Sequence, residues 1–280
     1  MKKFIAAFDG LSFSESTLEY AISFSSLSNA HLVGVFLEDF TRNSYSVSQL
    51  TAYEGNAFDD HLRELKETDN EERKKSIEIF IDACTEAGLS YSIHRDRNVA
   101  LQELLHESIY ADLLFINAGQ TLTKFKEASP SRFVKDLLGE VQCPVLVVPN
   151  KYNKIEKIII LYDGEPSSVF ALRSFSYLFD FTNSLETQVL TVKENNETMH
   201  VPDLKLIREF ARRHYPQAEY VLLKGHAEDE IIRYLKQEQK QAVVILGAYK
   251  RSRLSRLFRP SMADYLLHDM DIPLFIAHNK

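Results

Sequence analysis

The chain of 280 residues carries the same series of sequence landmarks twice. An apolar run that ends in Asp-Gly occurs at residues 4–10 and again at 158–164, and serines and a helix-like segment follow each run. A proline that opens an apolar run occurs at Pro144 and again at Pro273. Since an ordered repeat of this length indicates duplication of a whole folding unit, we predict two tandem domains, residues 1–150 and 151–280.

The two copies differ in length. The first landmarks lie 154 positions apart, whereas Pro130-Ser131 and Pro260-Ser261 lie 130 positions apart. The first copy therefore carries about 24 extra residues, within the range of about 39–75. Because this region is polar and rich in Ser, Asn and Asp, and because loops absorb insertions most readily, we expect a surface loop there.

Each copy alternates strand-like and helix-like segments. In the second copy, we predict strands at about 157–162, 187–193, 219–224, 242–247 and 273–277, with amphipathic helices near 203–213 and 228–236. Short, wholly apolar strands separated by helices indicate a doubly wound parallel sheet of five strands in each copy. Ligands bind such sheets at the carboxyl ends of the strands, which directs attention to Asp9, Asp163 and the loops after Asn117 and Gly247.

Composition excludes several functional classes. A net charge of −7 argues against nucleic-acid binding, and no apolar run reaches the roughly 18 residues of a membrane span. Two cysteines without a CxxC motif, Cys84 and Cys143, suit free thiols in a cytoplasmic protein. The nine histidines form no metal-ligand pattern, and His226 is the one nearest the predicted cleft. We find no nucleophile with a matched base, and therefore expect neither a structural metal nor an enzyme.

Two longer segments of the second copy support a resemblance to a known family. Gly225-His-Ala-Glu-Asp-Glu-Ile-Ile follows the third predicted strand of the second copy, and the segment 246–267 holds Gly247 and Pro260-Ser261 at a fixed spacing. With the repeated Asp-Gly and proline landmarks, the chain resembles the universal stress protein family in its tandem form. The resemblance implies a fold like that of the adenine nucleotide α-hydrolases, related to the Rossmann fold. It also implies pairing of the two last strands as an intramolecular pseudo-dimer, with a homodimer as a further assembly.

The resemblance also implies a set of ligand-binding residues. ATP-binding members carry the loop Gly-x2-Gly-x9-Gly-Ser/Thr, whose glycines let backbone N–H groups approach phosphate. Here the loop keeps its spacing but has Lys250 and Pro260 in place of glycines in the second copy, and Asn117, Gln120 and Pro130 in the first. The implied nucleotide or anion ligands are Asp163, Gly164, Val192, Gly247, Lys250, Arg251 and Ser261, and more weakly Asp9, Leu37, Asn117 and Ser131.

The basic run Lys250, Arg251, Arg253, Arg256 and Arg259 suits an anion, and its counterpart in the first copy, Lys124, Lys126 and Arg132, is weaker. Three functions stay open. The first is a regulatory stress protein that binds ATP, another adenine nucleotide or another anion in the second copy. The second is an interaction module without a nucleotide, and the third is a nucleotide hydrolase. We expect the second copy to hold any ligand and the first to act as scaffold.

Overall fold

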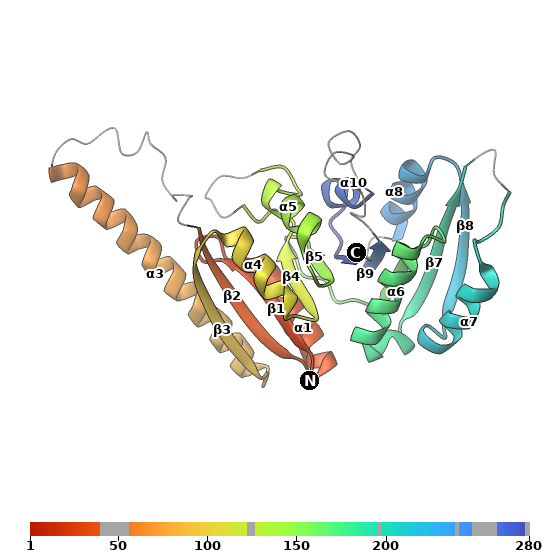
Figure 1. Cartoon of the computed structure of the whole chain (residues 1–280), viewed down its shortest axis with the longest axis horizontal. Coiled ribbons are helices and arrows are strands. Elements are labelled where there is room, and N and C mark those ends of the chain that lie inside the picture. The colour runs from red at the N-terminus through yellow and green to blue at the C-terminus, as the bar shows by residue number, and fades with distance from the viewer. Residues whose placement is uncertain (40–55, 122–126, 195–197, 239–240, 248–261, 278–280) are drawn as a thin grey trace.

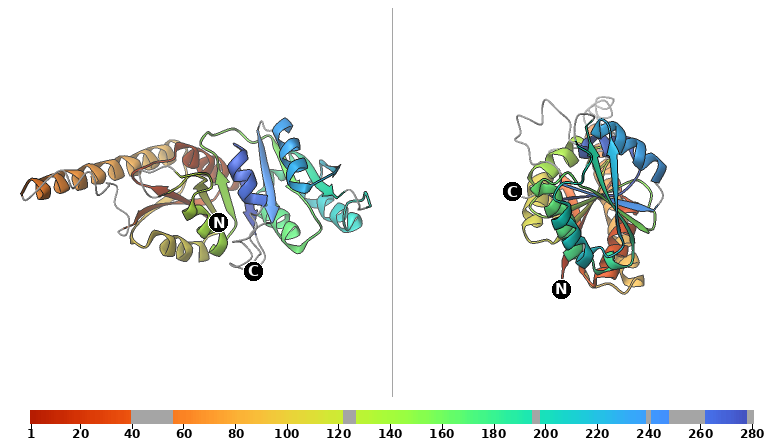
Figure 2. Two further views of the ribbon diagram at one scale, coloured as in Figure 1. Left: turned by 90° about the horizontal axis from the view of Figure 1, so that it is seen from above. Right: turned by 90° about the vertical axis from the view of Figure 1, so that its right-hand side faces the viewer.

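The computed structural model describes residues 1–39, 56–121, 127–194, 198–238, 241–247 and 262–277. Its described strands form one sheet of ten strands in the order β3-β2-β1-β4-β5-β10-β9-β6-β7-β8. The molecule is elongated along the direction in which the strands follow one another, and helices cover both faces of the sheet (Figures 1 and 2). The first copy supplies one half of the sheet and the second copy the other.

Both halves show the predicted alternation of strands and helices. The first half consists of β1 (Lys3–Asp9), α1 (Glu15–Ser28), β2 (His31–Asp39), α3 (Asn56–Glu86), β3 (Tyr91–Asn98), α4 (Ala100–Ile109), β4 (Leu113–Asn117), α5 (Arg132–Glu140) and β5 (Val145–Val148). The second half consists of β6 (Lys157–Leu161), α6 (Pro166–Leu178), the 3₁₀ turn η1 (Asp180–Asn183), β7 (Glu186–Lys193), α7 (Leu204–His214), β8 (Ala218–Lys224), α8 (Ala227–Glu238), β9 (Ala242–Gly247), α10 (Met262–Asp269) and β10 (Leu274–Ala277). The five strands predicted in the second half are confirmed to within one residue at each end.

The strands are apolar throughout because both faces of the sheet are buried. Along β1, Phe4 and Phe8 enter the hydrophobic cluster beneath α1, α3, α6 and α7, whereas Ile5 and Ala7 enter the cluster beneath α4, α5, α8 and α10. Side chains of a strand alternate between faces, so a strand buried on both sides must be apolar at every position. Within each half all described strand pairs are parallel, as predicted.

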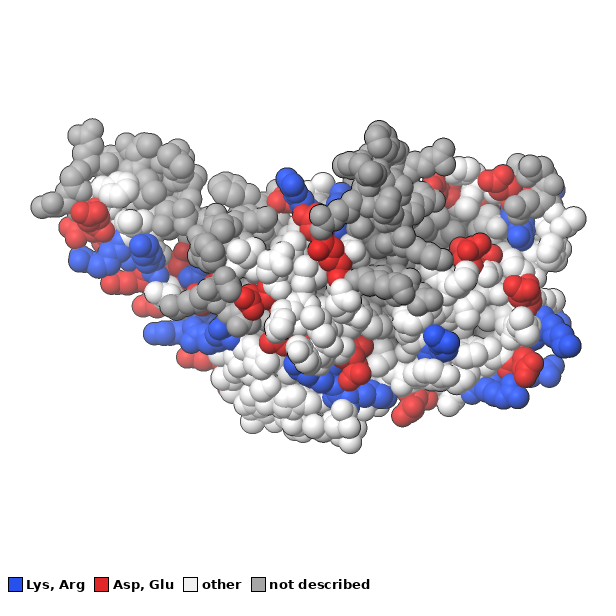
Figure 3. All heavy atoms as spheres, viewed as in Figure 1, with Lys and Arg blue, Asp and Glu red and all other residues white. Residues whose placement is uncertain are grey.

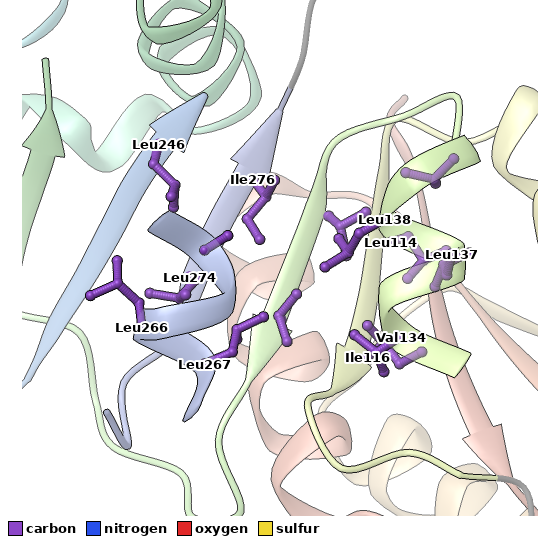
Figure 4. Packing of buried hydrophobic residues seen from close by; sticks show 14 of the residues in the cluster. Leu114, Ile116, Val134, Leu137, Leu138, Leu246, Leu266, Leu267, Leu274 and Ile276 are labelled. Atoms are coloured by element: carbon purple, nitrogen blue, oxygen red, sulfur yellow. The ribbon is translucent and has the colours of Figure 1, made fainter. Parts of the chain in front are cut away.

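The two halves join where β5 and β10 pair in antiparallel orientation, with Val145 opposite Ile276 and Val147 opposite Leu274. Leucines and a valine of α5 and α10 cover one face of this junction (Figure 4). On the other face the ring of Phe179, which is fully buried, lies 4.9 Å from that of Phe24 and 6.0 Å from that of Phe4. Aromatic pairs at such distances stabilise a core beyond their buried area, so the halves share one hydrophobic interior.

The expectation of a surface loop over about 39–75 is wrong for residues 56–75, which are the first part of helix α3. The sequence there is rich in Glu, Lys, Arg and Leu, which favour helix, and an ion pair one turn apart joins Arg63 to Asp60 at 2.8 Å. Residues 76–86 lie against the sheet, with Phe80 and Cys84 fully buried. The first turns of α3, before the buried Asp69, project from the body as an arm that carries both signs of charge (Figures 1 and 3). Residues 40–55 of the insertion lie outside the described residues.

Candidate functional site

A pocket of about 170 Å³ lies at the carboxyl edge of the second half. β6 pairs with both β7 and β9 in parallel orientation, so the ends of these strands meet at one edge. Asp163, Val192 and Gly247, predicted from three separate segments, all line this pocket. The rest of the lining is mostly apolar and comes from both strand ends and helices: Leu161, Tyr162, Ser168, Leu190, Ala227, Ile231, Leu246 and Met262.

Asp163 fixes the turn between β6 and α6. Its Oδ1 accepts a hydrogen bond from the backbone N–H of Glu165 at 2.9 Å and one from the hydroxyl of Ser168 at 2.7 Å. Gly164 lies in the same turn with φ +85°, in the left-handed region that favours glycine, and a Cβ there would lie 2.5 Å from the Cβ of Pro202. Asp163 is exposed, and its Oδ2 accepts no hydrogen bond from the described residues.

Gly247 allows β9 to approach the start of α6 closely. A Cβ at this position would lie 2.7 Å from the backbone nitrogen of Ser168 and closer still to the backbone of Ser167. No side chain fits into that space without movement of the helix. Gly247 therefore has a packing role that the sequence did not reveal. The other predicted ligands of this loop, Lys250, Arg251 and Ser261, lie outside the described residues, as do Arg253, Arg256, Arg259 and Pro260.

In the first half, Asp9 and Leu37 are neighbours on β1 and β2, and both are buried. Asp9 Oδ1 accepts a hydrogen bond from the backbone N–H of Leu11 at 3.0 Å, whereas Oδ2 has no hydrogen-bond partner among the described residues. Burial raises the pKa of Asp9 above its ordinary value of 3.8. The nearby charge of Arg73 opposes this increase in the pKa.

Helix α3 places the side chain of Arg73 beside the turn that follows Asp9. The hydroxyl of Ser76 donates to the backbone oxygen of Gly10 at 2.9 Å, and a Cβ on Gly10 would lie 2.7 Å from Cγ of Arg73. The Arg73 Nε lies 4.0 Å from a carboxylate oxygen of Glu38. The turn after β1 is therefore covered by α3, whereas Asp163 in the second half is exposed to solvent.

Asn117 occupies the position of Gly247 in the first half. Its Oδ1 accepts a hydrogen bond from the Gly119 N–H at 2.8 Å, and its Nδ2 donates to the backbone oxygen of Pro149 at 3.3 Å and to Asn150 Oδ1 at 3.2 Å. Ser131 is fully buried and caps α5, since its hydroxyl oxygen accepts from the Val134 N–H at 3.2 Å. Both side chains therefore hold the turn after β4 together. Lys124 and Lys126 lie outside the described residues.

A larger cavity, of about 820 Å³, lies between the two halves and was not predicted. The turn after β4, the end of β5 and Glu72 of α3 line it from the first half, and residues 267–272 line it from the second. A neighbouring cavity of about 280 Å³ lies beside the start of α1 and shares Ser12, Asn117, Gly119, Thr121 and Asn150 with it. The repeat alone gave no signal for this site, because its lining comes from segments that no single motif contains.

Metal and membrane sites are not evident in the part of the chain that the structure describes. No three His, Cys, Asp or Glu side chains there are placed to hold one metal ion. His226 is exposed beside Glu228 and Asp229 and does not line the second-half pocket. Among the described helices, none is long and apolar enough to span a membrane.

Comparison with known proteins finds similarity to one family. Residues 169–278 match the model of the Universal stress protein family. A curated relative, universal stress protein Slr1230 of Synechocystis sp., is 24% identical over 164 residues, which cover 58% of this chain and 56% of the relative. The chain thus spans little more than half the length of the curated relative that it matches.

Two solved structures resemble the whole chain. A universal stress protein from Archaeoglobus fulgidus superposes with a TM-score of 0.72 at 14% identity, over 99% of this chain and 98% of that one. A putative universal stress protein from Pseudomonas aeruginosa UCBPP-PA14 gives a TM-score of 0.57 at 14% identity, over 99% and 93%. The match to the family model is thus confined to residues 169–278, whereas the fold of these two solved structures extends over the whole chain.

Proposed function

We propose that the chain is a non-catalytic regulatory protein that binds the adenosine end of an adenine nucleotide in the second-half pocket. The observation that carries this proposal is the meeting of Asp163, Val192 and Gly247 around one mainly apolar pocket. A flat heterocyclic base suits apolar walls such as those of Leu190 and Ile231. At about 170 Å³, the described space suits a base rather than a whole triphosphate.

Asp163 has the chemistry to orient a nucleoside. Its Oδ1 is engaged in the turn, but its Oδ2 accepts no hydrogen bond from the described residues and is a suitable acceptor for a ribose hydroxyl. Lys250 and Arg251 follow Gly247 closely in sequence and supply positive charge for phosphate. The same loop lacks the second glycine of the ATP-binding pattern, so we propose weak binding.

A regulatory rather than catalytic role is the second part of the proposal. Of the polar side chains described in the pocket lining, the Ser168 hydroxyl already donates to Asp163, and that contact builds the start of α6. No histidine is among the described lining residues, so this hydroxyl lacks the imidazole base that commonly activates a nucleophilic serine. We propose the cytoplasm as the compartment, which suits the free thiols of Cys84 and Cys143.

The test is isothermal titration of the full chain with adenosine, AMP and ATP, with and without Mg²⁺. We expect saturable binding of one equivalent, with most of the affinity already present in adenosine. Ligand at 100 times its Kd should stabilise the fold by about 2.7 kcal/mol in a matched thermal-shift series. The variant Asp163→Ala should abolish binding, and Asp9→Ala should retain most of it.

Equal losses in the two variants would contradict the assignment to the second half. No heat and no thermal shift at millimolar ligand would contradict nucleotide binding as a whole. Release of phosphate from ATP above background would replace the regulatory proposal with a nucleotide hydrolase.

One observation favours a second candidate, an interaction module that binds no nucleotide. The close approach of Gly247 to Ser167 and Ser168 explains this glycine by packing alone. If the titration is silent, the pocket is a structural remnant of the fold.

A further inference from the structure

The sheet ends at two edge strands, β3 in the first half and β8 in the second, and their sequences differ. An edge strand presents unpaired backbone N–H and C=O groups to any extended chain, and charged side chains are a common protection against such pairing. β3 carries His, Arg, Asp and Arg in succession at residues 94–97. β8 instead carries Val221, Leu222 and Leu223 in succession, all partly buried, and no described strand pairs with its outer side. This outer side, which we call the β8 edge, therefore lacks the protection that β3 has.

Helix α7 directs two arginines toward the β8 edge. The guanidinium of Arg208 lies 5.5 Å from the centre of the Tyr220 ring of β8. Burial raises the pKa of Tyr220, and the charges of Arg208 and Arg212, one helical turn apart, oppose that increase. His214 lies on the opposite side of α7, since residues two apart on a helix are separated by about 200°, and its ring centre lies 5.3 Å from that of Tyr177 on α6. The arginines thus face the edge, and the opposite side of α7 faces α6.

Lys205 extends this pair of arginines to a row of three cations, and we call Lys205, Arg208 and Arg212 the α7 stripe. All three side chains are exposed, and none forms an ion pair within the part of the chain that the structure describes. The one acid of α7, Glu209, has a carboxylate oxygen 3.5 Å from Arg213 and is thus engaged. Figure 3 shows Lys and Arg side chains gathered at this end of the molecule, although the net charge of the chain is −7. A local excess of cations of this kind attracts carboxylates.

The alternation of side chains along β8 narrows the class of partner. Tyr220 and Leu222 pack on the face that α7 covers, whereas Val221 and Leu223 pack on the face that α8 covers. A strand added to the edge continues this alternation, so every second side chain of the added strand lies beside the α7 stripe and the others lie beside Val221 and Leu223. Glu219 is exposed on the α8 side, which favours carboxylates on the α7 side alone. We propose that the β8 edge binds an extended segment of a partner protein whose acidic side chains alternate with apolar ones.

Fluorescence polarisation of the full chain with a labelled peptide, in which three Glu alternate with three Val, tests this proposal. We expect saturable binding of one peptide. Adenosine at saturation should not compete, because no residue of β8 or of the α7 stripe lines the second-half pocket. The variant Arg208→Ala/Arg212→Ala should raise the Kd by about tenfold, since it removes two charge pairs at the edge. The matched control is Lys74→Ala/Lys75→Ala, which removes the same charge from exposed positions of α3 and should leave the Kd within about twofold.

A second peptide separates strand addition from general electrostatic attraction. Proline in place of the central Val keeps the charge but removes a backbone donor and does not fit a paired strand, so its Kd should be at least about tenfold higher. Equal Kd values for the two peptides, or for the two double variants, would overturn the proposal. So would tighter binding of a single-stranded oligonucleotide of the same charge, because a nucleic acid cannot extend the backbone ladder. A stable dimer of the chain that excludes the peptide would place a second copy at the β8 edge and would also overturn it.

Discussion

The two halves have the same strand order but differ at the carboxyl edge of the sheet, and one position accounts for much of the difference. In the second half, Gly247 lets β9 approach the start of α6, and the described pocket lies toward α8 and α10. In the first half, Asn117 stands at that position, and a cavity lies between its turn and residues 12–15 at the start of α1. The described pocket and cavity thus lie on different sides of this turn in the two halves.

The turn after the first strand differs in a related way. Helix α3 covers Gly10 with the side chain of Arg73, whereas Pro202, just before α7, lies against Gly164. Helix α3 contains 31 residues and α7 only 11. The extra length covers Asp9 and leaves Asp163 exposed. The two copies therefore share the architecture of the sheet but differ in how the turn after the first strand is covered.

The variant with the largest expected effect tests whether the two halves unfold together as one cooperative unit. Phe179 belongs to the second half but packs against Phe4 and Phe24 of the first. The variant Phe179→Ala should destabilise the chain by about 3–5 kcal/mol, because a fully buried ring leaves a cavity. Urea unfolding followed by circular dichroism measures this loss, and we expect one transition in both proteins.

A matched control is Tyr177→Ala in the last turn of α6, just before Phe179, since Tyr177 is 60% exposed and its truncation should cost far less. Two separate urea transitions in the unmodified chain, with only one of them shifted by Phe179→Ala, would show that the halves unfold independently.

Exchange of Gly247 and Asn117, each for the residue found in the other half, tests the role of this position at the carboxyl edge. Gly247→Asn should cost about 1–3 kcal/mol, because any side chain there displaces the backbone of α6. It should also weaken any ligand of the second-half pocket, which Gly247 lines. Asn117→Gly, in contrast, removes hydrogen bonds without a clash and should cost about 1 kcal/mol. Urea unfolding measures the loss of unfolding free energy in each variant, and we expect the larger loss for Gly247→Asn. Equal losses would mean that the close approach at Gly247 does not account for the difference between the halves.

Much of the fold was predictable from the repeat and from the apolar runs. Strands such as β9, with Val243 and Ile245 on one face and Val244 and Leu246 on the other, must be buried on both sides. Their parallel direction follows from strand–helix alternation. The meeting of Asp163, Val192 and Gly247 follows from the rule that parallel strands end at one edge.

Other features depend on contacts that the sequence does not contain. Helix α3 was missed because its first part buries little, so apolar spacing is weak, although Glu, Lys and Leu favour helix there. The packing role of Gly247 depends on how closely Ser167 approaches. The larger cavity between the halves depends on residues 267–272 meeting the turn after Asn117, which only the assembled sheet brings about.

The smallest expected effect concerns Asp9 and its dependence on pH. Burial holds the pKa of Asp9 above 3.8, so the folded state binds this proton more tightly than the unfolded state does. The stability that the proton contributes is fully present below about pH 3.8, the ordinary value, and is lost as the pH rises through the raised pKa. Asp9→Asn keeps an acceptor for the Leu11 N–H and removes the buried charge. We expect it to stabilise the chain by about 1 kcal/mol at neutral pH.

The free energy of unfolding, measured in urea from pH 4 to pH 7.5, distinguishes the cost of burying a charge from a change in stability that does not depend on pH. The difference between Asp9→Asn and the unmodified chain should grow with pH, because only the carboxylate pays the cost of burial. The same substitution at Asp163, which is exposed, should change the free energy of unfolding less at pH 7.5. A pH-independent difference for Asp9→Asn would mean that Arg73 fully compensates the buried carboxylate. In that case Asp9 would be a charged carboxylate paired with Arg73 of α3. Asp9 and Asp163 would then carry the same charge and differ only in their exposure to solvent.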